Sequence, residues 1–350
     1  MKRQKYILPI REAFSGSSIF WWMLWSGLVL IQGCQSSSDA EKNTIPVHQD
    51  SLSYYTGLID KNPNDEAALM ARARFFYTRQ SYGAALKDLE SALRIDSSRL
   101  ETYLLKSRVE MDYFRSLESL RTLQKAESLW PDSELTKEHL ARTLLILKQY
   151  DQAAEKAHQA LQIRPGAATP YLLLGMIAKE KQDTVTAIRY LQQAVQNDAD
   201  LLDAWIELAR MHTDKNPEEA AVYFESALQI APDDLLIWHA YGMFWQNMDS
   251  LEQAKNAYEK MISIDSTSVE AFLNHALILM DQDSFQTAIP LWNQYIRQRP
   301  EEAKGYYYRG ISYELTSQNK SALKDYQTAR SLDPGLENID DAIESLEDLE

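Results

Sequence analysis

The sequence has 350 residues, of which 36 are Lys or Arg and 51 are Asp or Glu, so its formal charge is −15. An acidic chain is unsuited to broad electrostatic binding of nucleic acid, because phosphate contacts dominate that affinity. The single cysteine excludes an intramolecular disulfide and a cysteine-rich zinc site. With 45% hydrophobic residues, 11 Gly and 11 Pro, the composition favours a folded, helical protein.

The first part of the chain has the features of an export signal. A basic stretch precedes a short apolar run within residues 19–31, and a membrane span would need roughly 20 such residues. The run ends in Leu30-Ile31-Gln32-Gly33-Cys34, which resembles the lipobox of bacterial lipoproteins. The resemblance implies that residues 1–33 are a signal peptide and that Cys34 is acylated. The alternative is an uncleaved signal anchor with an incidental cysteine.

Residues 34–50 are polar and show no periodicity, which predicts a flexible tether between the lipid and the folded region. Gln35, directly after the cysteine, resembles the outer-membrane sorting signal of enteric-type bacteria. The resemblance therefore implies a protein that is anchored in the bacterial cell envelope, in the outer membrane, through its N-terminal lipid. More than one acyl chain would make this anchoring stable.

A 34-residue period runs through the rest of the sequence. Numbered within this period, position 8 holds small residues, namely Ala73, Ser107, Ala141, Gly175, Ala209, Gly242, Ala276 and Gly310. Position 20 is also small, and bulky residues recur at positions 4 and 24, with Lys137 as the exception at position 4. Proline follows at position 32 in several copies. This pattern resembles the tetratricopeptide repeat (TPR), in which two helices pack closely through small residues.

The resemblance implies an all-α fold, a right-handed superhelical solenoid of about eight repeats over residues 51–334, each with a helix A and a helix B. A lone helix is expected at residues 51–62, and repeats are expected to start near residues 66, 100, 134, 168, 202, 235, 269 and 303. Residues 335–350 predict an amphipathic capping helix, whose apolar face consists of Ile339, Ala342, Ile343 and Leu346.

No motif for catalysis is apparent. The sequence contains no Gly-rich phosphate loop, no HExxH and no paired-cysteine motif. No two of the six histidines have the i,i+4 spacing that places a metal on one helix face. We therefore expect no enzyme, no cofactor and no metal, although a catalytic site without a recognisable motif is an alternative.

Four arginines share one position of the repeat. In the TPR family, helix A lines the concave face, and position 9 points towards it. This position holds Arg74, Arg108, Arg142 and Arg210. Arginine pairs bidentately with carboxylates, so these residues predict binding of an acidic protein or peptide segment. The alternative is that each arginine pairs with a nearby acid of the chain, from the set Glu101, Glu110, Asp112, Glu138, Asp203 and Glu207.

The second half of the chain has an apolar set at the corresponding positions, namely His239, Met243, Leu273, Leu277, Met280 and Tyr307. Such a wall suits a partner helix or an extended hydrophobic peptide. The alternative is that this half binds nothing or covers a contact between copies of the chain.

Together these features predict a lipid-anchored TPR scaffold that binds protein or peptide partners and supports assembly of an envelope complex. The resemblance is to TPR lipoproteins of the bacterial envelope, and fold alone does not choose among their pathways. The alternative function is a glycan- or carbohydrate-binding component of an envelope uptake system.

Overall fold

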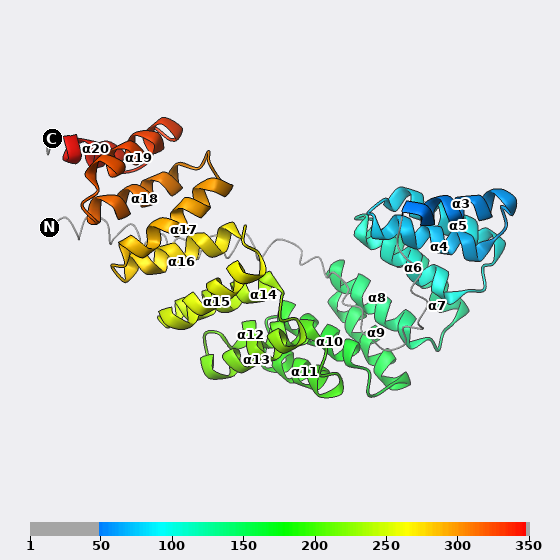
Figure 1. The fold of residues 1–350 in the computed structure, drawn as a ribbon. Helices are drawn as coiled ribbons and strands as arrows, with labels where there is room; N and C mark the ends of the chain where they lie inside the picture. The colour runs from blue at the N-terminus through cyan, green and yellow to red at the C-terminus, as the bar shows by residue number, and fades with distance from the viewer. Residues whose placement is uncertain (1–48, 348–350) are drawn as a thin grey trace. The chain divides into compact units, whose positions relative to one another are not determined.

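The computed structural model describes residues 49–347, and all regular structure in this range is α-helical (Figure 1). The chain divides into two compact units, which we call the N-terminal unit (residues 49–223) and the C-terminal unit (residues 224–347). The N-terminal unit contains α3 (Gln49–Lys61), α4 (Glu66–Thr78), α5 (Tyr82–Ile95), α6 (Leu100–Asp112), α7 (Ser116–Leu129), α8 (Glu134–Ile146), α9 (Tyr150–Ile163), α10 (Ala168–Glu180), α11 (Thr184–Asn197), α12 (Leu202–His212) and the start of α13 (Pro217–Ile230). The C-terminal unit contains the end of α13 and then α14 (Leu235–Asn247), α15 (Leu251–Ile264), α16 (Val269–Asp281), α17 (Phe285–Gln298), α18 (Ala303–Leu315), α19 (Asn319–Leu332) and α20 (Ile339–Glu347).

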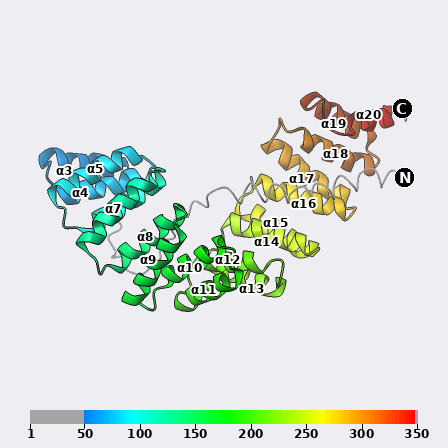
Figure 2. The ribbon, with the colours of Figure 1, turned by 180° about the vertical axis from the view of Figure 1, so that it is seen from behind.

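Within each unit, helices that follow one another in the chain pack side by side (Figures 1 and 2). After α3, helix A of the successive repeats is α4, α6, α8, α10, α12, α14, α16 and α18, and helix B is the helix that follows each of them. The predicted all-α repeat fold is thus confirmed. Among residues 49–347, no helix is both long and apolar enough to cross a membrane.

Small residues at position 8 allow helix A and helix B of one repeat to approach closely. A Cβ placed on Gly310 would lie 2.6 Å from Cε1 of Tyr326, and one placed on Gly242 would lie 2.8 Å from Cε1 of Tyr258. Both tyrosines occupy position 24 and are fully buried. Because the interior is close-packed, a large ring at position 24 requires glycine at position 8 in these repeats.

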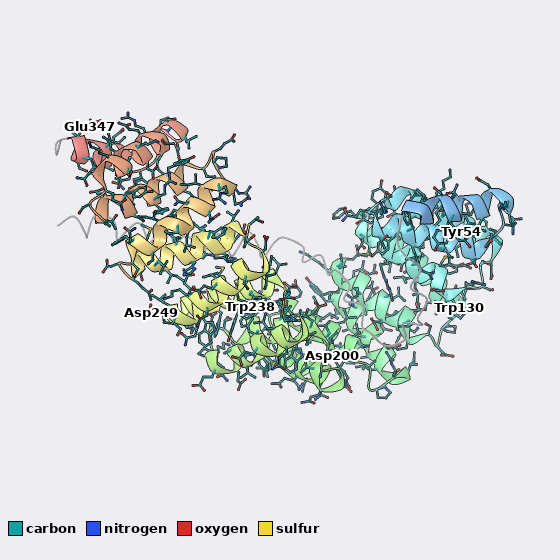
Figure 3. The ribbon with its side chains drawn as sticks, viewed as in Figure 1. Tyr54, Trp130, Asp200, Trp238, Asp249 and Glu347 are labelled. Atoms are coloured by element: carbon teal, nitrogen blue, oxygen red, sulfur yellow. The ribbon has the colours of Figure 1, made fainter. Side chains whose placement is uncertain are left out.

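Tryptophan at position 4 ties helix A to the turn that precedes it. The indole Nε1 of Trp205 donates to the backbone oxygen of Ala199 at 2.7 Å, and that of Trp238, which lies on α14 (Figure 3), donates to the oxygen of Pro232 at 2.8 Å. The same side chain therefore fills the inter-helix space and satisfies a carbonyl of the turn.

The turn between helix A and helix B, which we call the A–B turn, has a residue in the left-handed backbone region in most repeats. The next N–H then bonds back into helix A, as Ser81 N does to the oxygen of Phe76 at 2.8 Å. The left-handed residues of these turns are Gln80, Phe114, Lys148, Gln182, Asp249, Asp283 and Ser317. Phe114 is the one bulky apolar residue in this set.

The short helix α20 covers the C-terminal end of the repeats. Its apolar residues Ile339, Ala342, Ile343 and Leu346 are buried and belong to the same cluster as Tyr307 and Tyr326. The acids of α20 lie on its exposed side, which gives the end of the repeat array a polar outer surface.

Candidate functional site

Two of the four position-9 arginines are neutralised by the chain itself. Arg74 of α4 forms an exposed ion pair with Glu101 of α6. Arg210 of α12 lies 3.2 Å from Glu207, one turn earlier on the same helix. Glu207 also accepts a hydrogen bond from Lys179 at 2.5 Å. For Arg74 and Arg210, the structure therefore agrees with the alternative that the arginine pairs with an acid of the chain.

The two middle arginines have no such partner. Among the described residues, none forms an ion pair with Arg108 or Arg142. The acids near Arg108 have other partners, since Glu110 pairs with Lys106 and accepts from Thr122 at 2.7 Å, and Asp112 accepts from Tyr77 at 2.5 Å. In the structure, therefore, the first and last of the four arginines form ion pairs within the chain and the two between them form none with a described residue.

The carboxyl groups around Arg142 hold their protons to a higher pH than usual. Burial raises the pKa of Glu138 to about 7, although Arg142 acts in the opposite direction. Burial also raises the pKa of Asp203, again against the effect of Arg142. Near neutral pH, Glu138 is therefore only partly ionised and only partly neutralises Arg142.

His139 completes this part of helix α8. Burial, together with the nearby charges of Arg108 and Arg142, lowers its pKa, so the imidazole is neutral at physiological pH. A neutral imidazole beside two guanidinium groups can donate or accept a hydrogen bond while the arginines carry the charge. The composition alone did not single out His139. Its signal is its spacing of three residues from Arg142 on one helix.

Apolar side chains of α8 lie on either side of Arg142. Leu135 is 47% exposed and Ile146 is 41% exposed. Together with Glu138 and Arg142 they are spaced by three to four residues, so they share one face of the helix. We call Arg108, Leu135, His139, Arg142 and Ile146 the arginine face. It offers two positive charges next to exposed aliphatic surface, which can bind carboxylates and short apolar side chains.

The apolar set of the C-terminal unit is less accessible than predicted. His239 is half-buried, its Nε2 lies 3.3 Å from Nδ2 of Asn274, and burial lowers its pKa. Met243 is also half-buried. The expectation that Tyr307 faces a groove is wrong, because its side chain is only 6% exposed and packs against Tyr326 with ring centroids 5.9 Å apart. Leu277 and Met280 are buried as well.

The remaining predicted residue, Cys34, lies outside the described residues. Between residues 49 and 347, no three His, Cys, Asp or Glu side chains are grouped so that they could hold a metal ion.

Comparison with known proteins identifies the repeat. The tetratricopeptide repeat model matches residues 48–99, 172–234 and 273–337, which together make up just over half of the chain. Among solved structures, the C-terminal part of a TPR repeat-containing protein from Cytophaga hutchinsonii superimposes with a TM-score of 0.58 at 18% identity, covering 69% of this chain and 99% of that one. This likeness shows the fold.

Two curated relatives are members of protein complexes. The BBSome complex member BBS4 homolog of Drosophila melanogaster is 21% identical over 246 residues, which is 65% of this chain and 50% of the relative. Anaphase-promoting complex subunit 7 of Dictyostelium discoideum is 23% identical over 210 residues, which is 59% of this chain and 36% of the relative. The chain thus spans half or less of the length of these relatives.

These matches give no support to the carbohydrate-binding alternative, and they fit the general use of the TPR fold as a scaffold for protein–protein interaction. The family model and the helical pairs agree over the matched residues. The chain therefore belongs to the tetratricopeptide repeat family.

Proposed function

We propose that this protein is a lipid-anchored scaffold of the bacterial envelope, which binds an acidic segment of a protein partner on the arginine face and supports assembly of an envelope complex. The observation that carries the proposal is that Arg108 and Arg142 form no ion pair with any described residue, in a chain whose net charge is −15. Such a chain has an excess of acids, so leaving two arginines unpaired on one face favours a carboxylate from outside.

The chemistry of the face indicates what the partner segment contains. Guanidinium groups form strong, charge-assisted hydrogen bonds with carboxylates, often through two parallel N–H donors. Leu135 and Ile146 add exposed apolar surface on either side of Arg142. A segment in which Asp or Glu alternates with aliphatic residues would therefore satisfy both kinds of contact.

The lipid anchor rests on the sequence around Cys34. This cysteine is the only one in the chain and follows an apolar run that ends in a lipobox-like segment. Acylation there would hold the repeats at a membrane surface, and the residue after it favours the outer membrane. A Cys34→Ala variant should move the protein from the membrane fraction to the soluble fraction of its cells, and an unchanged distribution would contradict acylation.

Partner binding is tested with two matched double variants. Arg108→Gln/Arg142→Gln removes the unpaired arginines, and Arg74→Gln/Arg210→Gln removes the paired ones with the same change in charge. We expect cross-linking in the protein's own cells to capture an envelope protein with the wild type and the second variant, and to lose it with the first.

Circular dichroism should show that both variants keep their helical content. If both variants still capture the partner, the arginine face has no role in binding. If both variants lose the partner, the loss reflects net charge and not the arginine face, because both differ from the wild type by the same charge.

A further inference from the structure

Phe114 is an anomaly among the A–B turns. Its backbone is left-handed, with φ of 59°, and its side chain is 77% exposed. A bulky side chain is disfavoured in this backbone region, and exposing an apolar ring to water is unfavourable. The corresponding residues of the other turns are polar, namely Gln80, Lys148, Gln182, Asp249, Asp283 and Ser317. Within residues 49–347, nothing covers this phenylalanine.

The residues around Phe114 extend the exposed apolar surface. Tyr113 is 40% exposed and Leu117, at the start of α7, is 55% exposed. The ring of Tyr82, which begins α5 in the previous repeat, lies 5.7 Å from that of Tyr113. We call Tyr82, Tyr113, Phe114 and Leu117 the aromatic edge. These four residues lie at the A–B turns of the first two repeats.

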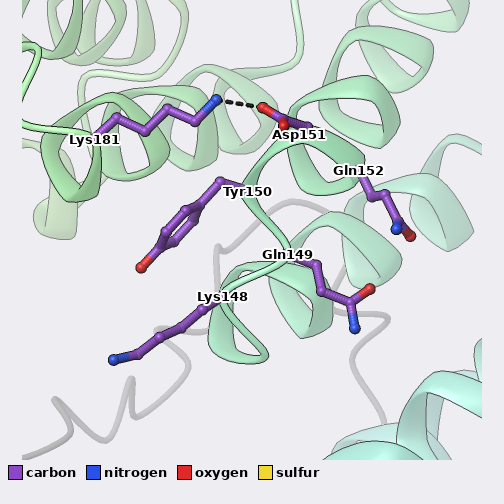
Figure 4. Close-up of a pocket in the computed structure, with 6 residues that line it drawn as sticks. All are labelled: Lys148, Gln149, Tyr150, Asp151, Gln152 and Lys181. Carbon is purple, nitrogen blue, oxygen red and sulfur yellow. Dashed lines mark hydrogen bonds and ion pairs between the residues drawn. The ribbon is translucent and has the colours of Figure 1, made fainter.

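Cations border the aromatic edge. Arg79 and Arg115 are exposed, and their guanidinium groups lie over the rings of Phe75 and Tyr113, at 4.7 and 4.5 Å. In the next A–B turn, Lys148 extends outward beside Tyr150 (Figure 4). None of these three cations forms an ion pair with a described residue.

Two acids near these cations have partners within the chain. Asp151 lies 2.5 Å from Lys181, which is the dashed contact in Figure 4, and Glu180 accepts from Tyr150 at 3.2 Å. Glu118 is exposed on α7. At the left-handed position itself, Lys148 of the N-terminal unit contrasts with Asp249, Asp283 and Ser317 of the C-terminal unit.

The chain enters the fold at the same edge. Helix α3 is joined to α4 by a short turn and packs against it, with Thr56 accepting a hydrogen bond from Arg72 at 3.3 Å. Two helices joined in this way are antiparallel, so the N-terminal end of α3 lies beside the A–B turn that follows α4. Cys34 precedes Gln49 by 15 positions, and that length of chain spans at most about 50 Å when extended.

We propose that the aromatic edge is the surface by which the N-terminal unit rests on a phospholipid bilayer, with Phe114 and Leu117 entering the boundary between headgroups and acyl chains and Arg79, Arg115 and Lys148 contacting lipid phosphates. Aromatic rings and basic side chains are the residue types that favour this boundary. The proposal rests on the proposed acylation of Cys34, which would place the bilayer on the side where the chain enters.

The test uses the acylated protein reconstituted in vesicles of phosphatidylethanolamine and phosphatidylglycerol. Because Cys34 is the only cysteine and is consumed by acylation, Phe114→Cys introduces a single thiol for a polarity-sensitive fluorophore. Leu236→Cys is the control, since Leu236 is 81% exposed at the start of α14 in the C-terminal unit. We expect spin-labelled phospholipids to quench the probe at position 114 several-fold more strongly than the probe at position 236.

Mass analysis of the peptide that contains Cys34 separates the two proposals. An unacylated cysteine would overturn the anchor itself. An acylated cysteine with equal quenching at both positions would overturn the contact of the aromatic edge with lipid and leave the anchor standing.

Hydrogen exchange on the unlabelled protein provides a measurement without the cysteine substitution. Amides of residues 113–117 should exchange several-fold more slowly on vesicles than in detergent, whereas those of residues 282–285, in a polar A–B turn, should not change. The Phe114→Asn variant should lose this protection. Equal exchange of residues 113–117 in both media would overturn the proposal.

Discussion

Arg72 and Asp88 are joined by two parallel hydrogen bonds, 2.7 Å from Nε to Oδ2 and 2.8 Å from Nη2 to Oδ1. Arg309 and Asp325 repeat this geometry with the same two distances, near the other end of the array. In both cases the arginine lies on helix A, directly before the small residue of position 8, and the aspartate lies on helix B. The two charged residues thus link helix A and helix B of one repeat.

Removal of one partner from this pair should destabilise the protein. The side chain of Asp325 is 6% exposed and that of Arg309 is 18% exposed, so Asp325→Ala leaves a largely buried guanidinium without its carboxylate partner and with only Asn293 as an acceptor. We expect a loss of about 3 kcal/mol in the free energy of unfolding, measured by urea denaturation. Arg309→Leu/Asp325→Leu, which replaces both charges, should unfold near the wild-type midpoint. A double variant as unstable as the single one would contradict this explanation.

Glycine at position 8 should tolerate no methyl group where position 24 is tyrosine. In Gly310→Ala, the new Cβ would meet the ring of Tyr326 at 2.6 Å, so the two helices must move apart. We expect a loss of about 1–3 kcal/mol in the free energy of unfolding. Gly83→Ala is the matched control, because nothing lies within 4 Å of its Cβ position and alanine favours a helix. Thermal unfolding of the two variants should shift in opposite directions.

Glu138 should make stability depend on pH. Burial raises its pKa to about 7 in the folded protein, whereas the pKa of an unfolded glutamate is about 4.3. Between these values the folded state binds more protons than the unfolded state, so this group's contribution to the free energy of unfolding falls as pH rises. Glu138→Gln should therefore be more stable than the wild type at about pH 8, with the difference disappearing near pH 4.

The neighbouring His139 contributes with the opposite sign. Its pKa is lowered in the folded protein, so its contribution falls as pH drops below the unfolded histidine value of about 6.5. The wild type and the Glu138→Gln variant both retain His139. Its effect therefore cancels when the two proteins are compared at each pH. A constant difference in denaturation midpoint from acid to alkaline pH would refute the assignment to Glu138.

Phe114→Asn should stabilise the isolated protein. Asparagine tolerates the left-handed backbone better than phenylalanine, and an exposed ring is lost. We expect a gain of up to about 1 kcal/mol in the free energy of unfolding, measured in detergent and without vesicles. The matched change Gln80→Asn, at the same turn position of the first repeat, should have a smaller effect. A destabilised Phe114→Asn protein would indicate that the ring has a structural role.

The fold was predictable because the helix contacts repeat. Each copy of the 34-residue period needs a small residue at position 8, so the pattern appears in the sequence many times. Departures from the pattern were not explained by the sequence. Lys137 at position 4 is an example, since its Nζ lies 2.5 Å from Oε1 of Glu127, on helix B of the preceding repeat. Such partners depend on three-dimensional packing and have no fixed spacing.

The candidate site was predicted only in part. Position 9 indicated the four arginines, but it did not indicate that Arg74 pairs with Glu101 of the next repeat whereas Arg108 forms no ion pair with a described residue. The predicted accessibility of Tyr307 was wrong because its ring packs against that of Tyr326 on helix B of the same repeat, a contact that the position of Tyr307 in the repeat did not indicate. Phe114 was missed because a single residue in a turn contributes nothing to the helical period.

The buried face of α20 has a consequence for assembly. Repeat arrays end in an apolar surface that another repeat would cover, and this surface could receive the first repeat of a second molecule. In this chain Ile339, Ile343 and Leu346 already occupy it, and the acids Asp340, Asp341 and Glu344 point outward. The surface that α20 covers is therefore not available for head-to-tail stacking with a second molecule.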